Sequence, residues 1–219
     1  MSAKGLKARA KLMAAAMVVL EKVGYHKMRI ADVTQEAGVA SGLFYHYFAD
    51  LKSLTREVLE DFISRSLQVE DIEQGVARGD WYARILAHNK PVVASYAKRP
   101  GIMRCLLQLA DEDAEFASLL RNHFIQQLTW LTRRMPKLFP DAALDEHQAL
   151  MVAYSLAGMA ETLLRDYFIN REPTLTAKPM SVDEMAELLS VLYYRGLFLS
   201  NPPAESLNYT ANLTAMHKQ

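Results

Sequence analysis

The chain has 219 residues, 51% of them hydrophobic and 23% charged, which suits one or two small globular domains with a substantial core. It contains 25 Lys and Arg against 25 Asp and Glu, and this zero net charge argues against a protein that coats nucleic acid along its whole length. The single cysteine, Cys105, rules out an internal disulfide framework and fits a reducing cytoplasm, where we expect the protein to act.

A first helix is expected from about Ala3 to Val23, with one apolar side made of Leu12, Ala16, Val19, Leu20 and Val23. Its apolar run from Met13 to Leu20 is too short to span a bilayer, so no membrane partner is expected. The first 30 residues hold seven Lys and Arg but one acid, Glu21. This excess predicts a localised phosphate-facing module, the alternative being a solvated helix face that happens to be basic.

The stretch from Arg29 to Leu54 predicts two short helices joined by a tight turn, with a longer helix beginning as it ends. Ile30, Val33 and Ala37 recur at helical spacing and give the first short helix one apolar face. Gly38 follows at once, where a helix end needs a residue that tolerates positive φ. The pattern is typical of a helix-turn-helix.

The second short helix has a buried stripe and an outer face of different chemistry. Phe44, Tyr47 and Phe48 form the expected stripe. The outer face carries hydroxyls, an imidazole, an apolar tip and one bare backbone position, on Ser41, Gly42, Leu43, Tyr45 and His46. Since this face has no acid, it suits the base edges and phosphates of a DNA major groove.

These residues resemble the TetR family of bacterial transcriptional regulators. The matching positions are Gly24-Tyr25, Ile30 to Val39, Gly42, the FYHYF segment from Phe44 to Phe48, and Leu54. The resemblance covers about the first quarter of the chain. It implies an all-α fold, with a three-helix DNA-binding domain containing the helix-turn-helix, followed by a larger helical effector-binding and dimerisation domain.

Four sites depart from the family pattern and concern individual DNA contacts rather than the module. Met28-Arg29 replace a threonine pair, Ala40 a serine and Leu43 a threonine, while the usual lysine is Leu51, with Lys52 one place later. We predict that double-stranded DNA is contacted by Lys27, Arg29, Ser41, Gly42, Leu43, Tyr45, His46, Tyr47 and Lys52. Tyr45 and His46 are the expected sequence readers, and each residue taken alone also fits a plain surface position.

The rest of the chain shows no strand pattern or repeat, and prolines separate its helical segments. Helices are expected over Trp81–Lys98, Gly101–Leu109, Asp113–Met135, Asp145–Ile169 and Val182–Leu199. Pro91 is expected to kink or split the first of these. By function, we divide the chain into a DNA-binding domain (1–51), a ligand-binding and dimerisation domain (52–201) and a C-terminal tail (202–219).

A stripe of small residues in the helix from Asp145 to Ile169 suits close packing of another helix. The last long helix has a broad apolar face. Two such helices from each of two chains would form the homodimer that the resemblance implies, with Ala153, Ala157, Gly158, Ala160, Leu188 and Leu192 at its interface. Alternatively, both stripes pack inside one subunit.

The resemblance also implies a small-molecule effector. Candidate ligand-binding residues combine aromatic, apolar and embedded polar side chains: Trp81, Tyr82, His88, Tyr96, Met103, Leu107, Phe116, His123, Phe124, Gln127, Tyr154 and Glu161. A cavity lined by these side chains suits a hydrophobic or amphipathic molecule. The alternative is that each of these residues simply packs in the hydrophobic core.

We therefore expect a ligand-responsive regulator, a repressor released from a palindromic operator by its effector. The alternative is a DNA-binding architectural or partner-docking protein without an effector. The six histidines are scattered, with no HExxH motif, zinc spacing or phosphate-cradling glycine loop, so no enzyme, metal or cofactor is expected. Cys105 has apolar neighbours and is expected to be buried and inert.

Overall fold

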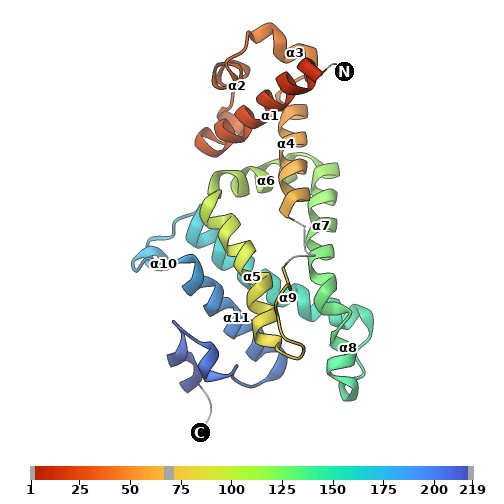
Figure 1. The fold of residues 1–219 in the computed structure, drawn as a ribbon, viewed down its shortest axis with the longest axis vertical. Helices are drawn as coiled ribbons and strands as arrows, with labels where there is room; N and C mark the ends of the chain where they lie inside the picture. Colours follow the sequence, from red (N-terminus) through yellow and green to blue (C-terminus); the bar gives the residue numbers. More distant parts are fainter. Residues whose placement is uncertain (1–2, 67–71, 217–219) are drawn as a thin grey trace. The chain divides into compact units, whose positions relative to one another are not determined.

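The computed structural model describes residues 3–66 and 72–216, and this part of the chain contains helices and turns but no strand (Figure 1). The predicted all-α class is confirmed. The helices are α1 (Ala3–Val23), α2 (Ile30–Ala37), α3 (Phe44–Tyr47), α4 (Leu51–Ser66), α5 (Trp81–Lys98), α6 (Pro100–Glu112), α7 (Ala114–Thr132), α8 (Met135–Leu138), α9 (Glu146–Leu164), α10 (Pro173–Thr176) and α11 (Val182–Phe198). Short 3₁₀ turns and one π-helical segment, Arg165–Ile169, lie between or after them.

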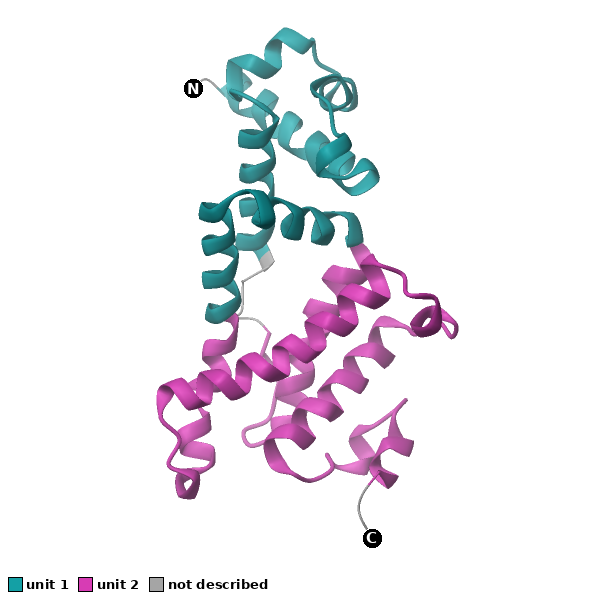
Figure 2. Ribbon diagram, turned by 180° about the vertical axis from the view of Figure 1, so that it is seen from behind, with its two compact units in different colours: residues 1–67, 99–126 teal, residues 68–98, 127–219 magenta. Residues whose placement is uncertain are grey.

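The chain forms two compact units, each made of segments that are far apart in sequence (Figure 2). Unit 1 comprises residues 1–67 and 99–126, and unit 2 comprises residues 68–98 and 127–219. The division at residues 51 and 201 is based on expected function, whereas these units are defined by their internal contacts. The functional division therefore stays a prediction. Residues 217–219 of the expected tail lie outside the described part of the chain.

Unit 1 is built on one continuous apolar core in which α1 packs against α2, α4 and α6. The fully or almost fully buried side chains include Leu12, Ala16, Leu20, Val33, Phe44, Phe48, Leu54, Leu59, Ile102, Leu109 and Phe116. Val23 was expected on the buried side of α1, but the structure contradicts this expectation. Its side chain is 43% exposed because it lies at the open C-terminal end of the helix.

The backbones of α1 and α6 are in direct contact. The Glu21 carboxylate accepts hydrogen bonds from the backbone N–H of Gly101 at 3.0 Å and of Ile102 at 2.9 Å. These groups belong to the first turn of α6, where N–H groups have no partner within the helix. A Cβ atom on Gly101 would lie 2.3 Å from the Glu21 carbonyl oxygen. Only glycine therefore permits this approach.

Unit 2 is organised around the packing of α5 along α11. The Asn89 amide donates to the Ser190 hydroxyl at 3.1 Å, and Lys90 pairs with Asp183 at 2.7 Å. Pro91 does not split α5, which runs without interruption from Trp81 to Lys98. The exposed Pro91 lies within a helix whose two halves are both held by buried side chains, Tyr82 and Ile85 before it and Val93 and Tyr96 after it.

The segment after α11 is held on that helix by a buried carboxylate. Glu187, only 3% exposed, accepts from the backbone N–H groups of Asn208, Tyr209 and Thr210 at 2.8, 2.7 and 2.7 Å, and from the Thr210 hydroxyl at 2.8 Å. Burial acts to raise the pKa of Glu187, but these hydrogen bonds outweigh it and the pKa lies below its usual value. The charged carboxylate therefore fastens the chain around residues 208–210.

Candidate nucleic-acid interface

Local contacts fix both ends of α2, the first helix of the helix-turn-helix. The Asp32 carboxylate accepts from the Arg29 N–H at 3.0 Å and so caps the start of α2. Gly38 adopts φ 63° and ψ 41°, the left-handed conformation expected of it. The Val39 N–H bonds the Thr34 carbonyl at 3.0 Å, as in a Schellman motif, which reverses the chain tightly.

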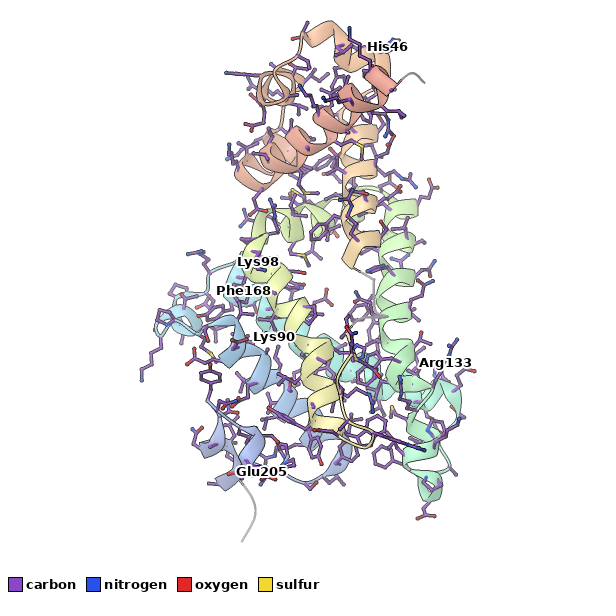
Figure 3. All side chains as sticks on the ribbon, in the orientation of Figure 1. His46, Lys90, Lys98, Arg133, Phe168 and Glu205 are labelled. Atoms are coloured by element: carbon purple, nitrogen blue, oxygen red, sulfur yellow. The ribbon has the colours of Figure 1, made fainter. Side chains whose placement is uncertain are left out.

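The second helix is a 3₁₀ turn, Ser41–Leu43, that continues into α3. Phe44 is 0% and Phe48 3% exposed, so both rings anchor this segment in the core of unit 1. Tyr45 is 64% exposed, and His46 is also exposed (Figure 3). These four residues thus lie as the helical periodicity predicts, whereas Tyr47 of the expected stripe and Leu43 of the expected outer face are half-buried.

Contacts beneath the outer face fix its position. The Ser41 hydroxyl lies 3.4 Å from the hydroxyl of Thr34, a buried residue that donates to the Ile30 carbonyl at 3.0 Å. The Arg9 guanidinium lies over the Phe48 ring, 5.1 Å from its centroid, and pairs with a carboxylate of α4. The outer face is therefore attached to α1, α2 and α4.

The predicted DNA-contact residues differ in their accessibility. Exposed positions are Lys27, Arg29, Ser41, Gly42, Tyr45, His46 and Lys52, whereas Leu43 and Tyr47 are half-buried. The Lys52 amino group already pairs with Asp113 of unit 1 at 2.9 Å, although half of its side chain stays exposed. The exposed residues from Ser41 to His46 offer a contiguous surface without an acid.

The comparisons with known proteins agree with this geometry. Residues 12–58 match the model of the "Bacterial regulatory proteins, tetR family". The segment spans the end of α1, the helix-turn-helix and the first half of α4. This N-terminal segment is therefore similar to the DNA-binding segment of the TetR family.

Two curated relatives of this chain are named HTH-type transcriptional regulator BetI. The protein of Vibrio vulnificus (strain YJ016) is 38% identical over 55 residues, which are 25% of this chain and 28% of that protein. The protein of Vibrio campbellii (strain ATCC BAA-1116) is 24% identical over 151 residues, 68% of this chain and 75% of the relative. The stronger identity is thus confined to about a quarter of the first relative's length.

A solved structure shows that the likeness in fold extends over most of the chain. A transcriptional-regulator chain from Saccharomonospora viridis, crystallised in complex with choline, superposes with a TM-score of 0.65 at 16% sequence identity. The match covers 84% of this chain and 93% of that one. At this identity the likeness establishes the fold alone.

The predicted ligand-binding residues are divided between the two units. Met103, Leu107, Phe116, His123 and Phe124 lie in unit 1, where Phe116 is a fully buried core residue. Trp81, Tyr82, His88, Tyr96, Gln127, Tyr154 and Glu161 lie in unit 2. Within unit 2, the pKa values of Glu161 and Tyr96 are both raised, first by burial, and the Glu161 charge adds to the effect on Tyr96. These two residues are therefore close enough to interact electrostatically.

The predicted dimer residues also differ in accessibility. Ala153, Ala157 and Ala160 are 0%, 6% and 7% exposed within the single chain, so their side chains face its own helices. Gly158 faces open space, and Leu188 and Leu192 are half-buried. Larger apolar side chains occupy the outer side of α9, namely Met151, Tyr154 and Met159, which are 53%, 44% and 41% exposed. The dimer residues predicted on α9 are the small ones, and they do not include Met151 or Met159.

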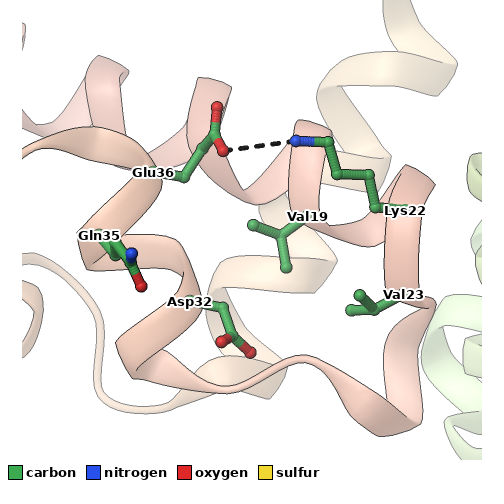
Figure 4. Close-up of a pocket in the computed structure, with 6 residues that line it drawn as sticks. All are labelled: Val19, Lys22, Val23, Asp32, Gln35 and Glu36. Carbon is green, nitrogen blue, oxygen red and sulfur yellow. Dashed lines mark ion pairs between the residues drawn. The ribbon is translucent and has the colours of Figure 1, made fainter.

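A surface hollow of about 470 Å³ lies within unit 1 (Figure 4). Its lining comes from α1 and α2: Val19, Lys22, Val23, Asp32, Gln35 and Glu36. Lys22 and Glu36 form an ion pair across it at 3.6 Å. The lining shares no residue with the predicted DNA-contact or ligand-binding sets, and its two acids make it unsuited to phosphate.

The described residues contain no group of three or more His, Cys, Asp or Glu side chains that could hold a metal ion. Within the same described ranges, no helix is long and apolar enough to cross a membrane. Cys105 is fully buried, and burial raises the pKa of its thiol to about 11. The predicted burial of this cysteine is confirmed, and at neutral pH its sulfur is a thiol rather than a nucleophilic thiolate.

Proposed function

We propose that the chain is a ligand-responsive transcriptional repressor that binds a palindromic DNA operator as a homodimer. The observation that carries this proposal is the helix-turn-helix surface, where Phe44 and Phe48 are buried and Tyr45 and His46 are exposed on an acid-free face. Such a surface can enter a major groove, and pairing of two copies places two of them about 34–36 Å apart on one side of the duplex.

Selection of bound DNA from a random pool, followed by gel-shift titration, tests this function. A palindrome should be recovered. Tyr45→Ala and His46→Ala should each weaken operator binding by about 5- to 150-fold, because a base contact contributes about 1–3 kcal/mol. The matched control is Tyr209→Ala, which alters a tyrosine of unit 2 that is 52% exposed. Equal binding of the operator by all three variants would contradict the proposed interface.

Lys27 and Arg29 are proposed to contact phosphates, since both are exposed just before α2. Replacing either with Ala should weaken binding to all sequences alike. It should also reduce the slope of log affinity against log salt concentration by about 1 for each phosphate that is no longer neutralised. A change in sequence preference instead of salt slope would contradict this role.

For the homodimer, we propose that the outer side of α9 contributes Met151, Tyr154 and Met159 to the interface, with Leu188 and Leu192 of α11. Large exposed apolar side chains on one helix are typical of an interaction surface. Met151→Glu should shift the sedimentation coefficient to that of a monomer. Leu199→Glu, at a residue 92% exposed outside this set, is the control.

The effector is proposed to be a small hydrophobic or amphipathic molecule bound in the ligand-binding domain, which shifts the population of dimers towards a spacing that no longer fits the operator. The choline bound to the related Saccharomonospora viridis chain supports a small-molecule effector for this one. A coupling of about 1–3 kcal/mol would change operator affinity roughly 5- to 150-fold. Operator titration with and without compounds that raise the melting temperature tests this step, and unchanged affinity with every such compound would favour an architectural DNA-binding protein.

A further inference from the structure

Unit 2 contains a group of charged side chains that converge on Glu73, in the loop before α5. Arg84 donates from Nε to Glu73 Oε2 at 2.9 Å, and Arg134 reaches the same oxygen from Nη2 at 3.3 Å. His88 Nε2 lies 2.9 Å from the other oxygen, Oε1. We call these four residues the Glu73 cluster. Its three nitrogen-bearing side chains thus surround a single carboxylate.

Two indole rings flank the Glu73 cluster. The His88 ring stacks on Trp130, with ring centroids 3.9 Å apart and planes 4° from parallel. The Arg134 guanidinium lies 6.0 Å from the centroid of the same indole, and the Arg84 guanidinium lies 4.9 Å from the centroid of Trp81. Flat apolar surfaces beside directed cationic donors are suited to a carboxylate carried on an apolar body.

The charges of the cluster do not balance. Arg84, His88 and Glu73 side chains are 13%, 11% and 23% exposed, and Arg134 is 39% exposed. Burial lowers the pKa of His88 although the Glu73 contact opposes it, which favours the neutral imidazole at pH 7. Burial acts to raise the pKa of Glu73, but the hydrogen bonds from His88 and Arg84 outweigh it, so Glu73 is ionised.

Among the residues that the structure describes, two guanidinium groups therefore face one carboxylate, which leaves one positive charge in excess. Asp80, the acid just before α5, is exposed, and its carboxylate is engaged with the Ala83 N–H at 2.9 Å. A partly buried charge without a counter-ion is unfavourable, and binding of an anion would relieve it.

We propose that the Glu73 cluster is a carboxylate-binding site in which Glu73 is the built-in occupant, displaced by the carboxylate of an amphipathic effector. The incoming carboxylate would take the donors of Arg84, Arg134 and His88, with its apolar body against Trp130. Glu73 belongs to the same chain and so competes at a high effective concentration. A small carboxylate alone is then too weak a competitor, and apolar contact has to supply the remaining affinity.

This site would bind the effector of the proposed repressor, and the effect of binding on operator affinity rests on that proposed function. Glu73 lies between α4 and α5 in the sequence, and α4 belongs to the core of unit 1 through residues such as Leu54 and Leu59. Displacement of Glu73 would detach its loop from α5 and from Arg134. Effector binding would thereby release residues 72–80, the described chain before α5, from Arg84 and Arg134.

The test uses the full chain without DNA and sodium octanoate as the probe, with octylamine and 1-octanol as charge-reversed and neutral probes of equal length. Calorimetric titration should show that octanoate binds the wild type more tightly than either of the others. Glu73→Ala should bind octanoate roughly ten-fold more tightly or better, because the competitor is gone, and should also bind acetate. Arg134→Met should bind octanoate at least about ten-fold more weakly, because it removes a charge-assisted hydrogen bond.

Two exposed residues of unit 2 provide matched controls, both labelled in Figure 3. Glu205→Ala and Arg133→Met should bind octanoate as the wild type does. If Glu73→Ala does not fold, Glu73→Gln provides the same test, since the neutral amide competes less for the guanidinium groups. Equal binding of octanoate and 1-octanol by the wild type, or unchanged octanoate affinity in the Glu73 variant, overturns the site.

The same experiment separates the site from the proposed function. Octanoate that binds in the expected variant pattern but leaves operator affinity unchanged overturns the effector role of displacement. A wild-type chain that selects no operator overturns the proposed function, while the octanoate titration still decides the carboxylate site by itself.

Discussion

The two units differ in how their interiors are built. Among the described residues of unit 1 the buried polar side chains are Thr34 and Thr55, and each hydroxyl donates to a carbonyl of its own helix, at 3.0 and 2.7 Å. In unit 2 the buried polar side chains are Glu187, Ser190 and Thr210, and Glu187 bonds to chain more than 20 residues away. In the described residues each unit also buries polar atoms without a hydrogen-bond partner, Gln108 Oε1 in unit 1 and the Tyr82 hydroxyl and Asn201 Oδ1 in unit 2.

This difference between the two interiors fits the role proposed for each unit. Close-packed apolar side chains hold one arrangement, which suits a surface that has to match a DNA groove. Directional polar contacts can be exchanged for others of similar geometry, so an interior that contains them can respond to a polar ligand. Substitutions at five positions probe this contrast, and the greatest change in stability is expected for the first of them.

Phe44→Ala should destabilise unit 1 by about 3–5 kcal/mol, because it removes a fully buried ring from the apolar core. Urea denaturation followed by circular dichroism measures the loss. Tyr45→Ala, at the next position and 64% exposed, is the control and should change stability by no more than about 0.5 kcal/mol. Similar losses for both variants would mean that the apolar core does not carry the stability of unit 1.

Glu187→Ala should destabilise unit 2 by about 2–4 kcal/mol, since it leaves three backbone N–H groups and one hydroxyl without their acceptor. Hydrogen exchange should show faster exchange at residues 208–210 and unchanged protection in α1. Glu205→Ala alters an exposed acid after α11 and is the control. Unchanged exchange at these residues would contradict the role of Glu187.

Gly101→Ala should destabilise unit 1 by about 1–3 kcal/mol, because the added Cβ would lie 2.3 Å from a backbone oxygen of Glu21 and force α1 away from α6. Gly158→Ala is the opposite case. Its Cβ meets nothing within 4 Å, so the change should stabilise α9 by about 0.5–1 kcal/mol. Thermal denaturation of both variants measures whether each substitution lowers or raises stability. A stabilising Gly101→Ala would disprove the close contact between the backbones of α1 and α6.

His88 should make the stability of unit 2 depend on pH. The pKa of His88 is lowered by burial, so the unfolded chain binds the proton more readily and stability falls as pH drops from 7 through the unfolded value of 6.5. The lowered pKa of Glu73 acts at more acidic pH, below its usual 4.5. His88→Gln should therefore flatten stability against pH between 7 and 5.5, measured by urea titrations, whereas His147→Gln, at an exposed position of α9, is the control.

Much of the fold could be predicted from the sequence because it depends on local periodicity. The bounds of α1 and α5, the left-handed Gly38 and the buried pair Phe44 and Phe48 all follow from patterns within a few residues. Pro91 shows the limit of such patterns, since packing of both halves of α5 maintains a helix that the local rule would interrupt.

The carboxylate contacts could not be predicted, because each joins residues far apart in sequence. Glu21 bonds Gly101 across 80 positions, and Glu73 meets Arg134 across 61. A partial signal existed on α5, where Trp81, Arg84 and His88 recur at helical spacing and include two polar residues on a half-buried face. Nothing in the sequence names Glu73 as their common partner.

The contact between Glu21 and the first turn of α6 bears on the engineering of chimeric sensors. A chimera that keeps only residues 1–51 would separate the helix-turn-helix from Gly101. It would also lack the apolar side chains of α6 that complete the core of unit 1. A functional transplant would instead carry residues 1–67 together with 99–126 and exchange the remainder. The unit that contains the helix-turn-helix is thus discontinuous, and its transfer requires three cuts in the chain, after residues 67, 98 and 126.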